Sequence, residues 1–487
     1  MSTAKHVHLI GICGTAMASL AGMLRAQGHR VTGSDTAAYP PMSDQLRAMG
    51  IPILEPYAAK NLEPRPDLVV VGNAISRGNA ELEVVLNERI PMTSMAALIH
   101  DEFLQGRDRF VVCGTHGKTT TTSILAWIYE TASRAETNDA ARWKPSFLIG
   151  GVPENFGTSF HVQEVTRPFI LEGDEYDTAF FDKGPKFLHY FPDAAILTHV
   201  EFDHADIYAD LEAVKTAFKR MVNLIPRRGR LVALDASENV TECAARAFCK
   251  VERYGFLEDS YWRAVDLRQE GASTSWKLLR GGQEFAHLRL PMAGEYNALN
   301  ATAAAALAAG QGVPVEAIEA AIASFKSVKR RLEVRAEVEG VTIIEDFAHH
   351  PTAIREVLRA LRAAYSGRRL WAVLEPRSNT LRRNIFEREL VESLSLADEV
   401  VLAGVFKSDA IPVLERLEPS HLVEALVTRG VPAVLGADAD AIVSDIVPRV
   451  RYGDVIAILS NGGFGGIYEK LPKAIETDSP LERRRDS

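Results

Sequence analysis

The sequence predicts an α/β protein of three domains. At 487 residues the chain is longer than one ordinary domain and suits two to four. Short apolar runs alternate with helical patterns along most of it, which is typical of parallel sheets with helices between the strands. Two apolar runs pass through glycine-rich turns into helices, at residues 11–17 and 113–120. Each turn belongs to one α/β unit, and a third unit follows the second.

The first unit covers residues 1–107. Its strands are predicted at 7–12, 29–35 and 67–74, and its helices at 16–28 and 81–89. The turn GICGTAM, followed about twenty residues later by Asp35, is similar to a dinucleotide fingerprint. Cys13 and Ala16 stand in place of two of its glycines. Backbone N–H groups at such a turn bind diphosphate whatever the nucleobase, so we predict a Rossmann-like domain with a diphosphate site.

The second unit covers residues 108–327 and begins with an apolar strand that meets Gly114 and Gly117. The helix that follows leaves several backbone N–H groups unpaired, and its dipole adds to their attraction for phosphate. Lys118 can reach the outer phosphates, and the hydroxyl of Thr119 can bind Mg²⁺. Val112 stands where the usual P-loop has a glycine. We therefore predict a P-loop ATPase-type α/β domain that uses a nucleoside triphosphate.

Acidic and histidine side chains gather at two later strands of this unit. The predicted strand 169–177 contains LEGDEYD, which is more acid than a buried strand end tolerates without cations, and carboxylates suit Mg²⁺. The predicted strand 194–206 ends in EFDHAD, which includes His204. Beside a phosphate loop, both segments are expected to contact metal or phosphate.

Two asparagines begin a later helix of the second unit, predicted at 297–310. Asn297 and Asn300 lie three residues apart and therefore share one face of that helix. Their amides can cap the helix or read the edge of an adenine by paired hydrogen bonds.

The third unit covers residues 328–487 and is predicted to be a Rossmann-like α/β domain. Polar groups follow two of its strands: DFAHHP includes Asp346 and His349, and EPRSNT includes Arg377 and Asn379. An acid, imidazoles and a guanidinium suit a polar or zwitterionic substrate. We expect a substrate site at these strand ends.

Composition narrows the class of protein further. The net charge of −9 gives no basic footprint for nucleic acid. No apolar run reaches the roughly 18 residues that a membrane span requires, and the first apolar run breaks at a glycine, unlike a signal peptide. The four cysteines form no CxxC pair, which fits a reduced, cytoplasmic setting.

The order of these motifs resembles the Mur ligases, the ATP-dependent amide-forming enzymes of peptidoglycan assembly. The resemblance rests on GTHGKTTT, the acidic strand, DHAD, the asparagine helix, VKRRLEV and DFAHHPT, and it extends from Val7 to about Leu471. It implies a UDP-N-acetylmuramate-binding domain, an ATP-binding domain and a peptide-binding domain. GICGTAM, TGSDTAAYPPMSDQL, EFDHADIY and EPRSNT are most similar to members that join L-alanyl-γ-D-glutamyl-meso-diaminopimelate to UDP-N-acetylmuramate for peptidoglycan recycling.

The resemblance also implies roles for individual residues. The sugar-nucleotide and peptide contacts would be Gly11, Gly14, Thr15, Asp35, Asn73, His349, Arg377 and Asn379. The ATP contacts would be Gly114, Thr115, Gly117, Lys118, Thr119, Thr120, Asn297, Asn300 and Arg331. The Mg²⁺ ligands would be Thr119, Glu172 and His204, and the catalytic groups Lys118, His204, Asp346 and His349. Tyr296 stands where a close relative has histidine.

Three alternatives remain open on the sequence. The acceptor can be free L-alanine, as in the ligases of de novo peptidoglycan synthesis. The turn at residues 11–17 can serve a nicotinamide-dependent dehydrogenase, and the phosphate loop can serve a switch or transport ATPase. Lys215 and Lys219 lie where several members of the family carry a carbamylated lysine, a feature that the nearer relatives lack.

Overall fold

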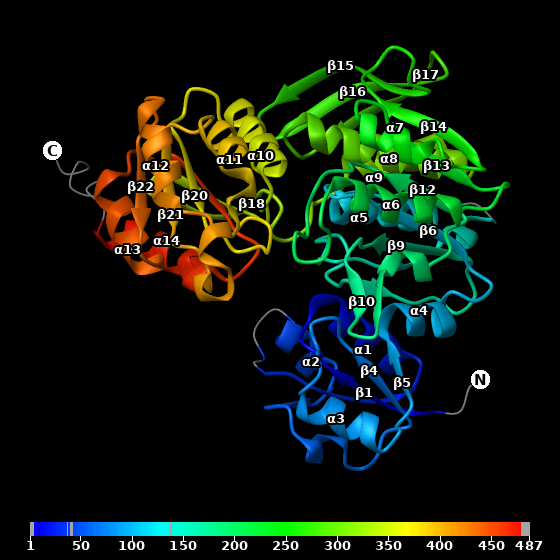
Figure 1. Ribbon diagram of the computed structural model, residues 1–487. Helices are drawn as coiled ribbons and strands as arrows, with labels where there is room; N and C mark the ends of the chain where they lie inside the picture. Colours follow the sequence, from blue (N-terminus) through cyan, green and yellow to red (C-terminus); the bar gives the residue numbers. More distant parts are fainter. Residues whose placement is uncertain (1–3, 37, 39–41, 137–138, 479–487) are drawn as a thin grey trace.

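The computed structural model describes residues 4–36, 38, 42–136 and 139–478. Figure 1 shows three bodies, with the N-terminal and C-terminal domains attached to different sides of the central one. Each body has its own sheet, and the α/β architecture predicted from the sequence is confirmed. We propose that the domains divide between residues 107 and 108 and between residues 327 and 328. No helix in the described part of the chain is long and apolar enough to cross a membrane.

The N-terminal domain is a parallel sheet of strand order β3-β2-β1-β4-β5. Its strands are β1 (His6–Ile10), β2 (Arg30–Ser34), β3 (Ile53–Leu54), β4 (Leu68–Val71) and β5 (Met92–Ser94). Its helices are α1 (Thr15–Ala26), α2 (Met42–Ala48), α3 (Ala80–Asn87) and α4 (Met95–Phe103). The strand order reverses between β1 and β4, and the crevice above such a reversal is the usual ligand site of an open parallel sheet.

The central domain is a long mixed sheet of strand order β17-β16-β15-β14-β13-β12-β6-β9-β7-β8. Its strands are β6 (Asp108–Cys113), β7 (Ser146–Leu148), β8 (Phe160–His161), β9 (Pro168–Gly173), β12 (Ala194–Leu197), β13 (Arg230–Leu234), β14 (Lys250–Gly255), β15 (Trp262–Glu270), β16 (Ser273–Arg280) and β17 (Gln283–Leu290). A separate hairpin pairs β10 (Asp177–Ala179) with β11 (Asp182–Pro185). The helices are α5 (Lys118–Ala132), α6 (Leu211–Asn223), α7 (Glu238–Ala244), α8 (Glu295–Gly310) and α9 (Val315–Ala323).

The C-terminal domain is a sheet of strand order β18-β19-β23-β20-β21-β22, parallel except for β18. Its strands are β18 (Glu333–Val338), β19 (Val341–Asp346), β20 (Leu370–Leu374), β21 (Glu399–Ala403), β22 (Ala433–Gly436) and β23 (Val455–Leu459). Its helices are α10 (Pro351–Ala364), α11 (Glu387–Leu394), α12 (Pro419–Thr428), α13 (Ala439–Ile446) and α14 (Ile467–Asp478). The α/β architecture predicted for this domain is confirmed, and its last strand, β23, lies between β19 and β20.

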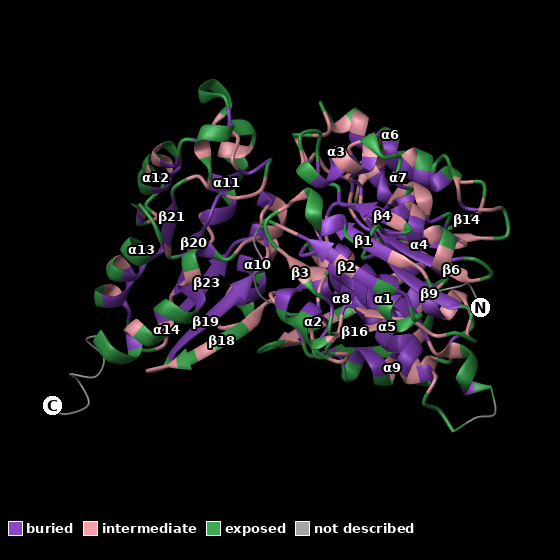
Figure 2. Ribbon diagram, turned by 90° about the horizontal axis from the view of Figure 1, so that it is seen from below, coloured by how far each residue is buried: buried purple, intermediate pink, exposed green. Residues whose placement is uncertain are grey.

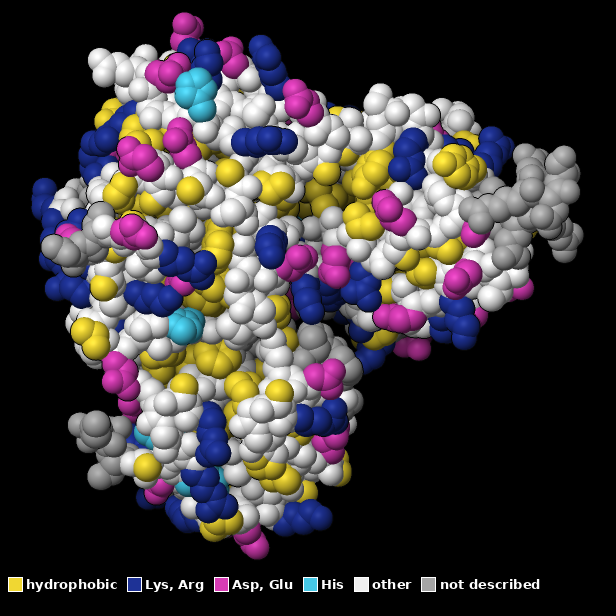
Figure 3. All heavy atoms as spheres, turned by 180° about the vertical axis from the view of Figure 1, so that it is seen from behind, with side chains coloured by type: hydrophobic (Ala, Val, Ile, Leu, Met, Phe, Trp, Pro, Cys, Tyr) yellow, Lys and Arg dark blue, Asp and Glu magenta, His cyan; other side chains and the backbone are white. Residues whose placement is uncertain are grey.

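The central strands of all three sheets are buried, as Figure 2 shows in purple. β6, β12, β20 and β23 are nearly continuous apolar runs, because helices cover both faces of a parallel sheet. The functional groups therefore come from the strand ends. On the face seen in Figure 3, charged side chains of both signs are interspersed.

Two predicted strands end earlier than the sequence indicated. The strand expected to reach Asp177 ends at Gly173, and the strand expected to reach Asp206 ends at Leu197. At Thr198 the chain turns, because its hydroxyl donates to the backbone oxygens of Cys113 and His116. Residues 174–176 and 198–206 are consequently loops at the strand ends, while Glu172 stays in β9 and Asp177 begins β10.

Candidate active site

The loop between β6 and α5 has the geometry of a phosphate cradle. Gly114 and Gly117 have φ angles of 134° and 79°, which residues with side chains rarely adopt. A Cβ on Gly114 would overlap the hydroxyl of Thr198, and one on Gly117 would lie 2.5 Å from Oδ1 of Asn300. The loop therefore tolerates only glycine at both positions, and it leads directly into the N-terminus of α5 at Lys118. Two further predicted contacts, Thr115 and Thr120, are buried in the same segment.

Lys118 lies at the centre of a charged cluster. Its Nζ is 2.7 Å from the backbone oxygen of Gly114 and 2.8 Å from Oε2 of Glu175. His204 approaches the other oxygen of Glu175, with Nε2 at 3.3 Å from Oε1. His204 has a φ of 54°, and this left-handed backbone accompanies the approach of its ring to Glu175. Lys118 and His204 are thus brought together as predicted, and Glu175 joins them.

The protonation states of this cluster follow from its contacts. Burial opposes ionisation of Glu175, but Lys118 and the hydrogen bond from His204 outweigh it and hold its pKa at about 2. Burial lowers the pKa of His204, but Glu175 more than compensates and raises it to about 9. Burial lowers the pKa of Lys118 as well, and Glu175 again reverses the direction. Near neutral pH the cluster is a carboxylate held between two cations.

Glu172 occupies a different position from Glu175. Its Oε1 accepts a hydrogen bond of 2.8 Å from the hydroxyl of Thr119, and its Oε2 accepts one of 2.7 Å from the N–H of Gly150. Burial and then the neighbouring Asp174 raise its pKa. A buried carboxyl whose charge is disfavoured, and which contacts the first hydroxyl of the phosphate-loop helix, is a suitable place for a cation.

Lysine side chains pair with several of the acids at residues 172–177, the segment for which the sequence predicted metal cations. Lys118 pairs with Glu175, while Nζ of Lys186 lies 3.5 Å from Asp174. Lys183 pairs with Asp177 at 2.6 Å. The acids of residues 172–177 are therefore not one uniform metal site, and Glu172 is the carboxylate that bonds to Thr119.

The C-terminal domain contacts this cluster through Asp203. Its Oδ1 accepts a 2.6 Å hydrogen bond from the hydroxyl of Thr380, and the N–H of Ala205 donates to the same hydroxyl at 3.2 Å. Asn379 also donates to Oδ2 of Asp206 at 2.7 Å. These bonds join segments about 175 residues apart in the chain, so they place the third domain's strand-end loop against the DHAD loop.

His349 faces Asp203 from the C-terminal domain. Its Nδ1 is 2.9 Å from the backbone oxygen of Phe347 and therefore carries the hydrogen, which leaves the lone pair on Nε2. Nε2 lies 3.9 Å from Oδ2 of Asp203. Burial lowers the pKa of His349, although Asp203 opposes this effect. The ring is therefore neutral near pH 7, with its basic nitrogen directed toward a carboxylate that would stabilise the protonated form.

Asp346 is buried at the end of β19 and is held by the backbone. Its Oδ2 accepts from the N–H of Leu332, and its Oδ1 accepts from the N–H of Ala348, each at 2.8 Å. Burial raises its pKa, against the effect of Arg331. The guanidinium of Arg331 lies 5.0 Å from the ring of Phe347, so it is near Asp346 at the junction of the domains.

Arg377 is held between an aromatic ring and a glycine. Its guanidinium lies 3.7 Å from the centre of the Phe406 ring, and a Cβ on Gly462 would overlap it. Glu375 is 3.4 Å away. Asn379, two residues on, accepts from Arg382. The loop thus presents guanidinium groups in fixed positions beside the DHAD segment.

The two asparagines of α8 are buried and already hydrogen-bonded. Nδ2 of Asn297 donates to the backbone oxygen of Ala293 at 2.8 Å, and Nδ2 of Asn300 donates to Oδ1 of Asn297 at 3.5 Å. Asn300 also abuts Gly117 of the phosphate loop. Their contact with adenine stays a prediction.

The predicted sugar-nucleotide residues gather at the crevice of the N-terminal sheet. Gly11 has a φ of 85° at the end of β1, Gly14 caps α1, and Thr15 begins that helix. Asp35 reaches back to this turn, where its Oδ2 accepts from the N–H of Cys13 at 2.9 Å. Asn73 is exposed just after β4, the strand beside β1. Part of the resemblance in this domain, at residues 37 and 39–41, lies outside the described residues.

Sequence reasoning missed three members of the site. Glu175 was one of four clustered acids, and nothing in the pattern distinguished it from Glu172. Asp203 and Thr380 stood inside motifs that we selected, yet their bond links two domains and has no local signal.

Lys215 and Lys219, which lie where several members of the family carry a carbamylated lysine, both form ion pairs with Glu242 in the central domain.

Family models match the chain in three consecutive pieces. The model for the Mur ligase family, catalytic domain, matches residues 6–105, the Mur ligase middle domain matches 112–308, and the Mur ligase, glutamate ligase domain, matches 330–462. The chain is 42% identical over 473 residues to the UDP-N-acetylmuramate–L-alanyl-γ-D-glutamyl-meso-2,6-diaminoheptandioate ligase of Escherichia coli, covering 96% of this chain and 97% of that one. It is 39% identical over 472 residues to the ligase of the same name from Haemophilus influenzae, covering 96% and 98%.

Solved structures give the same result. A murein peptide ligase from Psychrobacter arcticus aligns with a TM-score of 0.73 at 36% identity, over 97% of this chain and 99% of that one. A UDP-N-acetylmuramate–alanine ligase from Thermotoga maritima aligns with a TM-score of 0.78 over 99% of each chain, but at 21% identity it shows the fold alone. The family match leaves the dehydrogenase and the switch ATPase without support. The chain belongs to the Mur ligase family and is an ATP-dependent ligase that forms an amide bond.

Proposed function

We propose that this ligase joins L-alanyl-γ-D-glutamyl-meso-diaminopimelate to UDP-N-acetylmuramate, for the recycling of peptidoglycan in the cytoplasm. The observation that carries the proposal is that each domain has a candidate site at its strand ends: a diphosphate crevice, a triphosphate loop and a guanidinium-bearing loop. The names of the two relatives that are 42% and 39% identical support this choice of substrates. Four free cysteines, three of them buried, support a reducing compartment.

ATP solves a chemical problem in this reaction, because a carboxylate is a poor acyl donor. Transfer of the γ-phosphoryl group to the lactyl carboxylate of UDP-N-acetylmuramate gives an acyl phosphate. The amine of the peptide's alanine then attacks, a tetrahedral intermediate forms, and phosphate leaves. Lys118 is placed to neutralise charge that gathers on the transferred group, because it is a partly buried cation at the mouth of the phosphate loop.

The donor set beside the phosphate loop suits Mg²⁺. We propose that Thr119, Glu172 and His204 hold it, as the sequence predicted, and that Glu175 is a further ligand. Because a metal ligand must be deprotonated, His204 would give up its proton when the ion binds. Oxygen donors dominate the set, and Glu172 lies beside the hydroxyl of Thr119 in the first turn of α5. Mg²⁺ bound there would supply charge neutralisation for the phosphoryl groups.

The attacking amine must lose a proton, and we propose His349 as its acceptor. Nε2 of His349 carries the lone pair, and Asp203, 3.9 Å from that nitrogen, would stabilise the imidazolium. Asp346 has both oxygens engaged by backbone N–H groups, so its role is to hold the segment that carries His349. The sequence left open whether His349 or Asp346 accepts the proton. We assign proton transfer to His349 and the positioning of its segment to Asp346.

The guanidinium-bearing loop supports a peptide acceptor rather than a free amino acid. The tripeptide carries several carboxylates beyond the reacting alanine, and Arg377 is fixed by Phe406 and Gly462 in a position to bind one. Asn379 and Arg382 extend the polar surface toward Asp206.

The proposal is tested by measuring ADP release with ATP, Mg²⁺ and UDP-N-acetylmuramate while either the tripeptide or free L-alanine is added. We expect turnover with the tripeptide and at least a hundredfold lower kcat/KM with alanine. Reactions without UDP-N-acetylmuramate serve as the control and should release little ADP. Turnover with alanine and none with the tripeptide would assign the enzyme to de novo synthesis. ADP release that does not depend on the UDP-sugar would reject the ligase assignment.

A further inference from the structure

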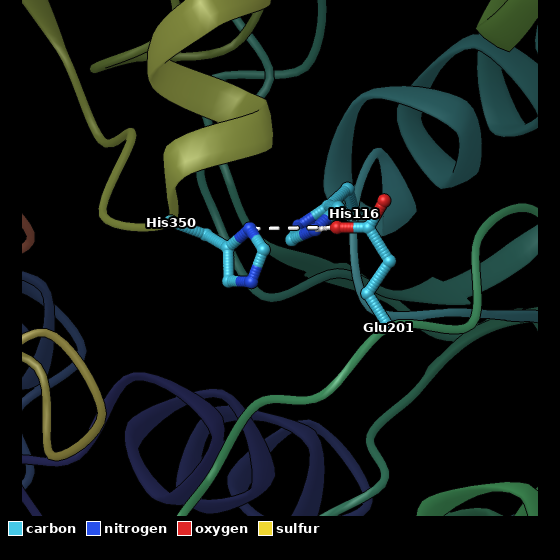
Figure 4. Close-up of side chains that lie close together, drawn as sticks. All are labelled: His116, Glu201 and His350. Atoms are coloured by element: carbon cyan, nitrogen blue, oxygen red, sulfur yellow. Dashed lines mark hydrogen bonds and ion pairs between the residues drawn. The ribbon is translucent and has the colours of Figure 1, made fainter. Parts of the chain in front are cut away.

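A second cluster of metal-type ligands lies beside the catalytic cluster and shares no residue with it. His116 belongs to the phosphate loop, and Glu201 belongs to the loop after β12. His350 is the residue that precedes α10, and its side chain lies near the other two (Figure 4). One ligand atom from each lies within 4.8 Å of the others. Neither the proposed mechanism nor the residues carried over from the family resemblance gives these three side chains a role.

The distances are close to those that a tetrahedral ion imposes. Nε2 of His116 is 3.0 Å from Oε2 of Glu201, and Nδ1 of His350 is 3.5 Å from the same oxygen. Ligands at about 2.0–2.1 Å around a tetrahedral Zn²⁺ lie about 3.3 Å from one another. The third pair, His116 and His350, lies within 4.8 Å, so side-chain rotation that brings these two nitrogens to the tetrahedral spacing would surround an ion.

The protonation pattern also suits a metal. Nε2 of His350 lies 3.2 Å from the backbone oxygen of Phe202, and Nδ1 accepts from the N–H of Thr352 at 3.3 Å. Nε2 therefore carries the hydrogen. The single lone pair of Nδ1 accepts from Thr352, and Nδ1 lies 3.5 Å from Glu201, so a bound ion would take this lone pair in place of the Thr352 N–H. An imidazole whose other N–H donates to a carbonyl is the usual arrangement of a histidine ligand. Burial and then the neighbouring His116 lower the pKa of His350 to about 3, so the ring is neutral.

The carboxylate of the cluster is ionised and already oriented. Burial raises the pKa of Glu201, but the hydrogen bond and charge of His116 outweigh burial and hold it at about 2. The hydroxyl of Thr352 donates to its Oε2 at 2.8 Å. Metal ligands must be deprotonated, so Nε2 of His116, which donates to Glu201, would give up its hydrogen when an ion binds, whereas the carboxylate of Glu201 is ready to bind.

The cluster is accessible and spans two domains. Glu201 lines both a cavity of about 220 Å³, shared with His350 and Thr352, and one of about 450 Å³, shared with His199 and Asn239. An ion can therefore enter, and water can complete its coordination. Because His350 belongs to the third domain and the other two ligands to the second, a bound ion would fasten the third domain to the phosphate loop.

We propose that His116, Glu201 and His350 form a site for a first-row transition dication, best suited to Zn²⁺, which ties the C-terminal domain to the phosphate loop. Two imidazoles and one carboxylate favour such an ion over Mg²⁺, whose preferred ligands are oxygens. The site is separate from the proposed Mg²⁺ site at Thr119, Glu172 and His204.

The test uses the full chain, stripped with a chelator and returned to buffer containing millimolar Mg²⁺. Zn²⁺ binding is measured by competition with a chromophoric chelator, and bound metal is counted after gel filtration. We expect one Zn²⁺ per chain, at least about tenfold weaker binding in both E201Q and H350A, and a rise of the unfolding temperature with Zn²⁺ in the unmutated protein only. H116N is the second ligand variant, in case H350A fails to fold because His350 caps α10.

Two further variants identify the source of any binding. H421A changes an exposed histidine of the C-terminal domain, which also contains His350. This variant should retain Zn²⁺ binding fully. H204N alters the catalytic cluster and should retain it too. Zn²⁺ binding that is lost in H204N but kept in E201Q and H116N would overturn the proposal, as would the absence of binding tighter than about 100 µM in the unmutated protein. These binding measurements do not depend on the ligase substrates, so they stand apart from the test of the proposed function.

Discussion

Replacing Lys118 with methionine is expected to lower kcat by at least about a thousandfold, which corresponds to about 4 kcal/mol of transition-state stabilisation. Lys118 is a partly buried cation at the phosphate loop, held by Glu175 and the backbone oxygen of Gly114. Methionine preserves the length of the side chain but removes the charge. The measurement is steady-state ADP release with saturating tripeptide and UDP-N-acetylmuramate.

Lys183→Met provides the matched control for this substitution. Lys183 also pairs with an acid of the 172–177 region, Asp177, but it is largely exposed and lies away from the phosphate loop. It should keep nearly full activity. Because Lys118→Met leaves Glu175 without its cation, the fold of that variant is checked by its circular dichroism and by UDP-N-acetylmuramate binding. A folded Lys118→Met variant with more than a tenth of normal activity would refute the role of the loop in phosphoryl transfer.

Glu175→Gln is expected to reduce kcat/KM by about 10²–10³-fold and to raise the Mg²⁺ concentration needed for half-maximal activity. Glu175 lies between Lys118 and His204, and its charge holds both cations in place. Losing that charge removes a proposed metal ligand and leaves two like charges close together. The measurement is a Mg²⁺ titration of initial rates.

Glu172→Gln separates the two carboxylates. Glutamine at 172 has one acceptor oxygen and can accept from Thr119 or from Gly150, but not from both. Because Glu175 keeps its charge in this variant, the loss of activity should be smaller than in Glu175→Gln. Equal Mg²⁺ dependence in Glu175→Gln and the unmutated enzyme, together with a large change in Glu172→Gln, would reject Glu175 as a further ligand and leave Glu172 as the only carboxylate of the proposed set.

The sequence was most informative where the chemistry is local. The positive φ angles of Gly114 and Gly117, the helix that begins at Lys118, and the hydroxyl of Thr119 all belong to one short segment. Even the missing glycine has a local cause. Val112 is a fully buried residue of β6, paired with β12 on one side and β9 on the other, so the turn begins only after Cys113.

Contacts between distant segments could not be predicted in the same way. The sequence places four acids within residues 172–177, but only the fold shows that β9 ends at Gly173 and that Glu175 then faces Lys118. The bond from Thr380 to Asp203 crosses two domains. The antiparallel strands β15–β17 were also not predicted. The strands of this domain were recognised by the reactive side chains at their ends, and β15–β17 carry none of the predicted site residues.

The central claim is that the enzyme activates the lactyl carboxylate of UDP-N-acetylmuramate as an acyl phosphate for attack by the tripeptide amine. The most direct measurement uses UDP-N-acetylmuramate labelled with ¹⁸O in that carboxylate and follows the products by mass spectrometry. We predict one ¹⁸O atom in each phosphate released and the other in the new amide of UDP-N-acetylmuramoyl-tripeptide. Unlabelled phosphate, or a product that contains alanine but no tripeptide when both acceptors are present, would contradict the claim.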